Sequence, residues 1–225
     1  GLSRQIALQR QMDVVANNMA NINTTGFKAE NLLFEEFKMP VARDKDFQSG
    51  DQPLSYVQDW ATVHDLSGGA MVQTGSDLDV ALNGDGFFVI QTPAGERWSK
   101  SGAFQLNASG TLVDASGNPV LGQSGPISFG PEETGILIGK DGSINSSAGA
   151  KGSLRLVEFA NPQELTREGN NLYAGGTPTA AINTRAMQGF IEKSNVSGVT
   201  EMAEMIRVQR AYESAASLAS RQDDL

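Results

Sequence analysis

The stretch "VANNMANINTTGFK", from Val15 to Lys28, begins with the apolar spacing of a helix and ends in a turn at Gly26. It places four asparagines within about two helical turns of one another. Asparagine is unfavourable inside a helix because its amide competes with the backbone for hydrogen-bond partners. The stretch therefore predicts a helix that ends just before Gly26, with amides crowded at that end.

Apolar residues leading into this stretch are spaced three or four positions apart, as on one face of an amphipathic helix. The other positions are mostly polar, so such a helix needs a partner for one narrow stripe and cannot be buried all round. The pattern alone leaves two interpretations open, packing on the chain's own domain or packing on another subunit. The stripe consists of Leu8, Met12, Val15, Met19 and Ile22.

A second amphipathic helix is predicted after "SNVSG", where Ser197 is the candidate N-cap. We expect the two stripes to pack on each other as a coiled-coil-like layer. Ile206 is expected to face the first stripe, in the same or a neighbouring subunit. The second stripe consists of Met202, Met205, Ile206, Tyr212, Ala216 and Ala219.

The region between the two helices has two parts. Residues 30–75 show no sustained period and predict an extended connector with short strands. Residues 76–186 alternate short apolar runs with Asn-Gly, Asp-Gly and Ser-Gly turns, which is typical of an antiparallel β-rich domain. The predicted fold class is therefore α+β, with residues 1–29 and 187–225 forming a discontinuous helical assembly domain and the β-rich domain central.

Composition restricts the classes of partner. Lys and Arg number 17 and Asp and Glu number 26, which gives a net charge of −9. Such a charge repels nucleic acid and anionic membrane surfaces, and no apolar run approaches the roughly 20 residues of a spanning helix. The absence of cysteine excludes disulfides and thiolate metal sites. We therefore expect neither nucleic-acid binding nor direct membrane insertion.

Candidate catalytic groups do not form a recognisable motif. His64 is the single histidine and has no nucleophile motif beside it, so a loop position is the favoured interpretation. Asp77, Asp79 and Asp85 lack the spacing of an EF-hand loop, and "GDGFF" lacks the third glycine of a dinucleotide motif. The sequence predicts no catalytic, cofactor-binding or metal-ligating residues and no cofactor. An enzyme with scattered catalytic carboxylates ranks behind structural and binding roles.

"ANNMANINTTGFK" resembles the signature of flagellar basal-body rod and hook proteins, in which an ANN-x-AN segment leads into T-x-GFK. Three further stretches are similar to this family in the expected order. Residues 77–122 resemble its central β module, residues 152–173 its later strands and residues 189–213 its C-terminal signature. Residues 1–30 and 124–144 look most like the proximal-rod members.

The resemblance implies a structural subunit of the rod, the periplasmic drive shaft that transmits torque from the flagellar motor to the hook. The implied partners are other proximal and distal rod proteins and copies of itself in a helical assembly. Export through the flagellar type III apparatus, without a cleaved signal peptide, is implied as well. We also expect further residues before Gly1 and after Leu225 in the complete protein. Open helical assembly requires unlike surfaces that meet on successive subunits, and a stripe at each terminus would supply them.

The asparagine amides are expected to be buried between subunits, because uncharged amides are desolvated at far lower cost than charges. Gly26 would let the chain leave the helix where a side chain would obstruct it. The alternative is a solvated helix end. The predicted assembly interface comprises Leu8, Met12, Val15, Asn17, Asn18, Met19, Asn21, Ile22, Gly26, Phe27, Met202, Met205, Ile206, Gln209, Tyr212 and Ala216.

Two alternative functions remain at this point. One is a distal-rod or hook-type axial protein of the same family, since these share the terminal signatures. The other, from a different class, is a β-rich surface adhesin or carbohydrate-binding module. Such a module would need aromatic platforms, for which Trp60 and Trp98 are the only tryptophans.

Overall fold

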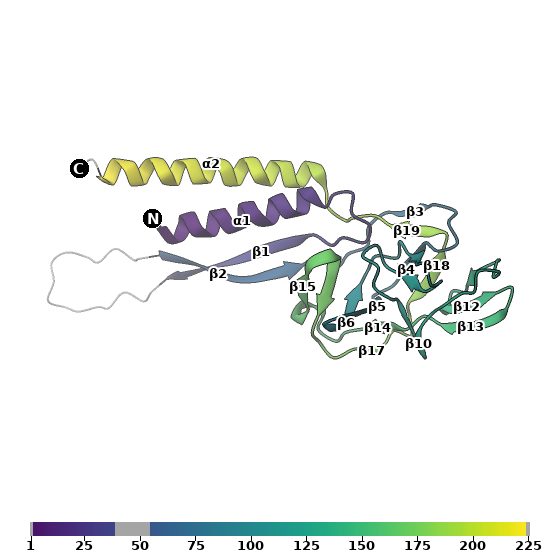
Figure 1. Cartoon of the computed structure of the whole chain (residues 1–225). Coiled ribbons are helices and arrows are strands. Elements are labelled where there is room, and N and C mark those ends of the chain that lie inside the picture. Colours follow the sequence, from purple (N-terminus) through teal and green to yellow (C-terminus); the bar gives the residue numbers. More distant parts are fainter. Residues whose placement is uncertain (1, 39–54, 224–225) are drawn as a thin grey trace. The chain divides into compact units, whose positions relative to one another are not determined.

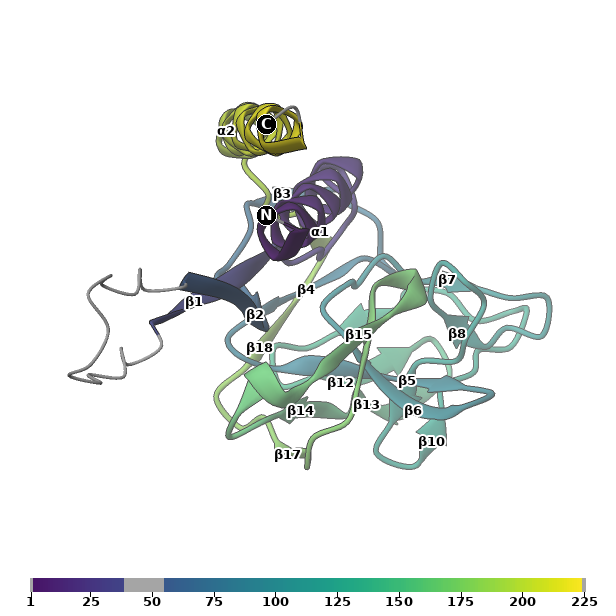
Figure 2. The same ribbon diagram turned by 90° about the vertical axis from the view of Figure 1, so that its left-hand side faces the viewer.

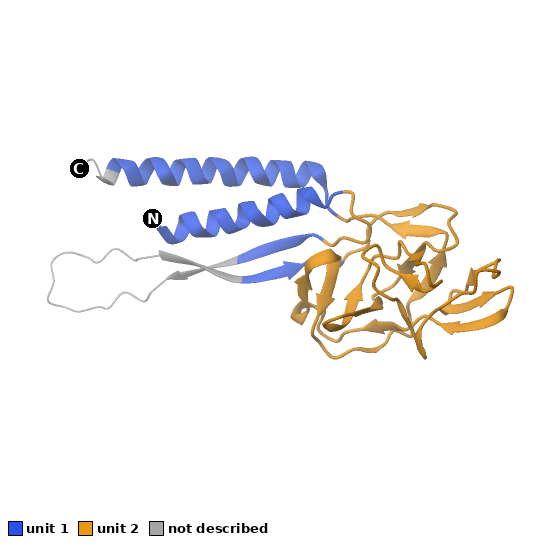
Figure 3. Cartoon of the chain, viewed as in Figure 1, with its two compact units in different colours: residues 1–22, 29–66, 196–225 blue, residues 23–28, 67–195 orange. Residues whose placement is uncertain are grey.

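The computed structural model describes residues 2–38 and 55–223 (Figure 1). The chain divides into two compact units, each of which is discontinuous in sequence (Figure 3). Unit 1 comprises Gly1–Ile22, Ala29–Leu66 and Val196–Leu225, and unit 2 comprises Asn23–Lys28 and Ser67–Asn195. The predicted border at residue 29 and the predicted borders at 75 and 186 therefore differ from those of the structure.

Unit 1 contains two helices, α1 (Leu2–Ala20) and α2 (Gly198–Asp223), which pack along each other. In Figures 1 and 2, α1 lies between α2 and a two-stranded hairpin. Ser197 caps α2, because its Oγ accepts a hydrogen bond from the Thr200 N–H at 3.4 Å. The terminal helices and the antiparallel β-rich region confirm the predicted α+β class.

The hairpin consists of β1 (Glu30–Lys38) and β2 (Ser55–His64), in antiparallel register from Glu30 opposite His64. The hairpin lies within residues 30–75, for which an extended connector with short strands was predicted, and its strands are longer than expected. A register shift between Leu33 and Phe34 interrupts the alternation of faces, and a two-stranded ribbon against one helix has little fully buried surface. Both effects weaken the periodic signal in the sequence. Residues 39–54 of the predicted connector lie outside the described residues.

Unit 2 is built from short antiparallel strands. Six of them form one sheet in the order β15-β16-β6-β5-β14-β17, and β11, β12 and β13 form a second sheet. The remaining strands pair as β18-β4, β19-β3, β7-β8 and β10-β9. The strands are β3 (Met71–Gln73), β4 (Val80–Asn83), β5 (Phe87–Thr92), β6 (Gly95–Ser99), β7 (Gln105–Leu106), β8 (Leu112–Val113), β9 (Leu121–Gly122), β10 (Gly125–Pro126), β11 (Leu137–Ile138), β12 (Ser143–Ser146), β13 (Gly149–Ser153), β14 (Leu156–Glu158), β15 (Thr166–Glu168), β16 (Leu172–Ala174), β17 (Thr179–Ala180), β18 (Arg185–Gln188) and β19 (Phe190–Glu192), with single 3₁₀ turns at Pro162–Glu164 and Gly169–Asn171.

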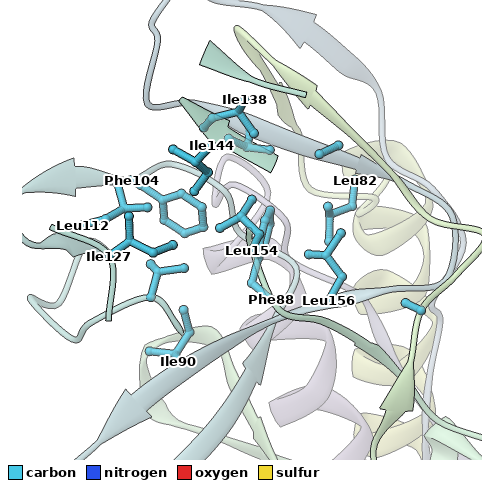
Figure 4. Close-up of a cluster of buried hydrophobic side chains, with 14 of the residues drawn as sticks. Leu82, Phe88, Ile90, Phe104, Leu112, Ile127, Ile138, Ile144, Leu154 and Leu156 are labelled. Atoms are coloured by element: carbon cyan, nitrogen blue, oxygen red, sulfur yellow. The ribbon is translucent and has the colours of Figure 1, made fainter. Parts of the chain in front are cut away.

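The core of unit 2 gathers aliphatic and aromatic side chains from β4, β5, β8, β11, β12, β14, β16 and β18 and from the segments that connect the strands (Figure 4). Phe88 and Ile90 of β5 are completely buried, and the Phe88 ring meets the Phe104 ring edge to face with centroids 4.8 Å apart. Edge-to-face geometry is favourable for aromatic rings because the positive edge of one meets the negative face of the other. The core thus depends on close approach of short strands.

Gly102 shows how tight this approach is. The Val80 N–H donates to the Gly102 carbonyl at 3.0 Å, and a Cβ built at Gly102 would overlap the Val80 carbonyl oxygen. Gly102→Ala is therefore expected to lower the free energy of unfolding of unit 2 by about 2 kcal/mol or more, because the two backbones must separate.

Chemical denaturation followed by tryptophan fluorescence would measure this loss. Gly68→Ala is the matched control, since a Cβ at Gly68 meets nothing within 4 Å. The control should change stability by less than about 0.5 kcal/mol. Equal stability of the two variants would contradict the packing described for Gly102.

Candidate assembly surface and the buried motif

Asn18 on α1 is almost completely buried within unit 1, with 1% of its surface exposed. Its Nδ2 donates to the Glu30 carbonyl oxygen at 2.8 Å and to Glu201 Oε1 at 3.2 Å. Its Oδ1 accepts from the Glu30 N–H at 3.0 Å. One amide therefore joins α1, β1 and α2, and it does so inside a single subunit and not between subunits as expected.

These surroundings raise the pKa of the Glu201 carboxyl group. Burial raises its pKa, the hydrogen bond from Asn18 lowers it and the nearby charge of Glu204 raises it. Glu204 has a lowered pKa because it is paired with Arg207 and accepts a hydrogen bond from Gln11 Nε2 at 2.6 Å. The start of α2 is thus tied to α1 by two polar contacts.

The other asparagines of the motif have different environments. Asn17 and Asn23 are exposed and Asn21 is half-buried. The Asn21 Nδ2 donates to the Asn17 carbonyl oxygen at 2.8 Å, which is a local contact one turn back along the chain. These three side chains remain on the surface of the described chain, so the predicted burial of the amides applies within this subunit to Asn18.

The stripe predicted on α1 is only partly covered by unit 1 itself. Val15 is buried, as is Ala7, which the sequence pattern did not single out. Leu8, Met12 and Met19 are half-buried. Ile22, at the end of the stripe, is exposed.

The stripe predicted on α2 divides between two faces. Val208 is the fully buried residue that faces the rest of unit 1, and sequence analysis missed it. Ile206 is 49% exposed and Met202 is 56% exposed. Two positions along a helix correspond to about 200° of rotation, so Ile206 lies on the side nearly opposite Val208. Ile206 therefore does not face the α1 stripe of its own subunit.

An outer stripe follows from this geometry. Val199, which is 83% exposed, is followed by Met202 and Ile206 at spacings of three and four, so the three side chains share one exposed face of α2. We call these three residues the outer stripe. Gln209 and Ala216 are also exposed, and Met205 is half-buried toward the inner side.

A groove of about 240 Å³ lies between α1 and α2 within unit 1. It brings together residues that the sequence pattern assigned to two separate stripes. Its lining is mainly apolar where the helices approach, with polar groups at its rim. The lining residues are Leu8, Gln9, Met12, Asp13, Val208, Gln209 and Tyr212.

Gly26 and Phe27 are buried within unit 2, and not on the surface to which the prediction assigned them. Gly26 has a φ of +68°, and a Cβ there would lie 2.6 Å from the Lys100 carbonyl carbon. The turn places the Phe27 ring beneath the Arg167 guanidinium, whose carbon is 4.3 Å from the ring centroid. A cation over an aromatic face is favourable. The last residues of the asparagine-rich motif, Gly26 to Lys28, therefore belong to unit 2.

Lys28, Lys100 and Glu192 form a buried charged cluster in unit 2 that the sequence did not suggest. Lys28 and Glu192 form an ion pair with both side chains nearly inaccessible. Lys100 Nζ donates to the Gly86 carbonyl oxygen at 2.7 Å and lies 4.2 Å from the centroid of the Phe87 ring. Burial, with a smaller contribution from the charge of Lys28, lowers the pKa of Lys100 to about 8.

His64 and Trp98, which were considered above for catalysis and for sugar binding, are both buried in the folded chain. His64 is buried in unit 1, with Nδ1 3.2 Å from Glu30 Oε1. Trp98 is buried, and its Nε1 donates to the Gly175 carbonyl oxygen at 2.8 Å, so it is no open platform for a sugar. The side chain of Trp60 is outside the described set. Among the residues whose side chains the structure describes, no three His, Cys, Asp or Glu gather as a metal site. None of the helices in the described residues is long and apolar enough to cross a bilayer.

The buried amide gives a first test of unit 1. Asn18→Ala leaves the Glu30 peptide group and the Glu201 carboxyl without their partner, so the free energy of unfolding should fall by about 2 kcal/mol. Urea denaturation followed by helical circular dichroism measures this change. Asn17→Ala, an exposed neighbour, should stay within about 0.5 kcal/mol of the wild type. Similar effects of the two substitutions would show that Asn18 does not hold the unit together.

The pKa of Lys100 gives a second test. Between pH 8 and the ordinary lysine pKa of 10.5, the folded state releases a proton that the unfolded state keeps. Stability should therefore rise with pH in this window, by up to roughly 2 kcal/mol more in the wild type than in Lys100→Met. Denaturation of both proteins at pH 7.5 and pH 10 measures the difference. Equal pH dependence would mean that Lys100 titrates normally.

Three family models match this chain in the order of the structural elements. The model described as "Flagella basal body rod protein" covers residues 1–28, which include α1. "Flagellar hook protein FlgE/F/G D1 domain" covers residues 81–146 of unit 2. "Flagellar basal body rod FlgEFG protein C-terminal" covers residues 187–225, which include α2.

Curated relatives match over nearly the whole chain. Flagellar basal-body rod protein FlgF of Caulobacter vibrioides is 40% identical over 222 residues, covering 97% of this chain and 89% of the relative. FlgF of Mesorhizobium japonicum is 36% identical, covering 96% and 89%. Flagellar basal-body rod protein FlgG of Bacillus subtilis is 33% identical, covering 100% and 94%. This chain therefore belongs to the flagellar basal-body rod protein family.

Proposed function

We propose that this structural protein of the flagellar basal-body rod is a subunit of its proximal part, in the periplasm, where it passes torque from the motor toward the hook. It would assemble there with other rod proteins and with copies of itself. The 40% and 36% identity to the FlgF proteins of Caulobacter vibrioides and Mesorhizobium japonicum supports the proximal assignment. A distal-rod position is the alternative within the family.

The observation that carries an assembly role is the outer stripe. Unit 1 has already used the inner face of α2 to bury Val208, yet Val199, Met202 and Ile206 remain exposed on another face. Contiguous exposed apolar side chains mark protein interaction surfaces, because burying them on a partner removes apolar area from water. A helical array needs one surface of each subunit to meet a different surface of the next.

The groove between α1 and α2 is the candidate for the complementary surface. It is concave and mainly apolar, and it lies on the same unit as the outer stripe. A stripe on one subunit and a groove on the next would form a heterologous contact that can repeat without closing. This contact would include the predicted interface residues that stay exposed or half-buried, among them Met12, Met202, Ile206, Gln209 and Tyr212.

A subunit of such an array must reach the periplasm before it assembles. We infer export through the flagellar type III apparatus, as the resemblance implies. The role proposed here requires a stiff and repeating structure and assigns no reaction to the chain.

Ile206→Asp tests the outer stripe. An unpaired carboxylate buried at a subunit contact costs several kcal/mol, so incorporation into the rod should fall more than about 100-fold and motility should be lost. Because Ile206 is half-exposed in the isolated subunit, the melting transition of the purified protein should remain near that of the wild type. Swimming assays and basal-body counts in a complemented deletion strain give the readout.

Ser217→Asp is the matched control. It introduces the same side chain at an exposed position three turns further along α2, on about the same face, outside the outer stripe. Motility of this variant should be normal. Normal motility of Ile206→Asp would remove the outer stripe from the assembly surface.

A further inference from the structure

The chain passes between unit 1 and unit 2 four times, after Ile22, Lys28, Leu66 and Asn195. Three segments of unit 2 adjoin these passages, namely residues 23–28, residues 67–70 and residues 192–195. A chain that changes units at separate, unlinked places would allow each passage to bend on its own. Here the three segments meet at one place inside unit 2.

A single buried ion pair contacts all three segments. Lys28 of the first segment pairs with Glu192 of the third, and both residues are at most 4% exposed. Lys28 Nζ also donates to the Ser67 carbonyl oxygen of the second segment at 2.8 Å. Glu192 Oε1 in turn accepts from the Gly69 N–H at 2.8 Å.

Backbone contacts reinforce the same meeting point. The Gly26 N–H donates to the Glu192 carbonyl oxygen at 2.7 Å, and the Asn195 N–H donates to the Phe27 carbonyl oxygen at 3.1 Å. Asn195 Nδ2 reaches the Ser67 carbonyl oxygen at 3.1 Å. A Cβ at Gly69 would overlap the Lys193 carbonyl oxygen, so the segments pack backbone against backbone.

Other residues of unit 2 also contact the first segment, residues 23–28. Arg167 of β15 lies over Phe27 and donates to the Lys28 carbonyl oxygen. Asn171 Nδ2 donates to the Thr25 carbonyl oxygen at 3.1 Å. Residues 23–28 are thus held along most of their length, and the cluster is continuous with the rest of unit 2.

The choice of a buried ion pair has a physical consequence. Desolvation of two charges offsets most of their attraction, so such a pair adds little net stability compared with well-packed apolar side chains. Its directional hydrogen bonds instead define where the three segments lie relative to one another. An apolar cluster could tolerate sliding, whereas a carboxylate shared by an ammonium group and a peptide N–H cannot.

We propose that Lys28 and Glu192 are positioning residues that tie the three segments together and so stiffen the passage between unit 1 and unit 2. This inference rests on the torque-transmitting role proposed above, because a flexible connection within each subunit would reduce the torque that the rod transmits. The tie itself is a property of the single chain and can be tested without a rod.

The variant Lys28→Met/Glu192→Gln removes both charges together, so that neither is left buried without a partner. The chain contains no cysteine, which allows clean spin labelling at Ser217→Cys in α2 and Ser116→Cys in an exposed turn of unit 2. Pulsed electron paramagnetic resonance on the purified protein then measures the distribution of distances between the labels. We expect the distribution to become about twofold wider in the variant, because released passages behave as hinges.

Lys151→Met/Glu133→Gln is the matched control. Glu133 likewise accepts from a lysine and from a peptide N–H, that of Gly130, but the pair lies far along the chain from every passage between the units. This variant should keep the wild-type width. Asn195→Ala is a milder second variant that removes the side-chain hydrogen bonds from Asn195 to the Ser67 carbonyl oxygen and hydroxyl. It should give an intermediate width even if the double variant fails to fold.

Unchanged widths in Lys28→Met/Glu192→Gln and Asn195→Ala would overturn the proposal, as would equal broadening in the Glu133 control. Cells provide a separate readout, since the double variant should form basal bodies but lose swimming speed more steeply than the wild type as the medium is made viscous. If Ile206→Asp cells swim normally, the assembly proposal fails while the label distances still decide the tie. If Ile206→Asp abolishes motility as expected and the distributions of label distances do not widen, only the proposal about Lys28 and Glu192 is overturned.

Discussion

The amide of Asn18 is the contact on which unit 1 depends, because from α1 it bonds to β1 and to α2 at once. Both of its donor hydrogens and its acceptor oxygen have partners, on the Glu30 peptide group and the Glu201 carboxyl. A buried polar group that is fully paired specifies one arrangement, whereas an apolar side chain would permit several. An aspartate would lack the donors, and a leucine would lack every bond.

Unit 2 uses aromatic rings to accommodate buried positive charge. Lys28 pairs with Glu192, and the carboxylates of Glu192 and Asp85 both act on the nearby Lys100. Phe87 lies under the ammonium group of Lys100, and the guanidinium carbon of Arg167 is 4.3 Å from the centroid of the Phe27 ring and 5.4 Å from that of Tyr173. The negative faces of these rings offset part of the desolvation of the cations. The lowered pKa of Lys100 shows that the compensation is incomplete.

In the assembly proposed above, the two faces of α2 have separate roles. Glu201 and Val208 on the inner face hold the subunit together, while Val199, Met202 and Ile206 on the outer face leave apolar area for a partner. A patch of three side chains is small, and a net charge of −9 opposes nonspecific association. Substitutions on the two faces should therefore have separable consequences for folding and for the rod.

The sequence by itself determined the terminal helices, the antiparallel β region and the family, because helical spacing, Asn-Gly turns and the ANN-x-AN to T-x-GFK signature are local patterns. It could not decide which face of α2 points inward, that the long hairpin belongs with the helices, or that Gly26 and Phe27 lie in the β unit. Those outcomes depend on partners far along the chain. Asn18 and Glu201 are 183 positions apart, and Lys28 and Glu192 are 164 apart. Burial is a property of such distant contacts, so only the tertiary structure could assign it.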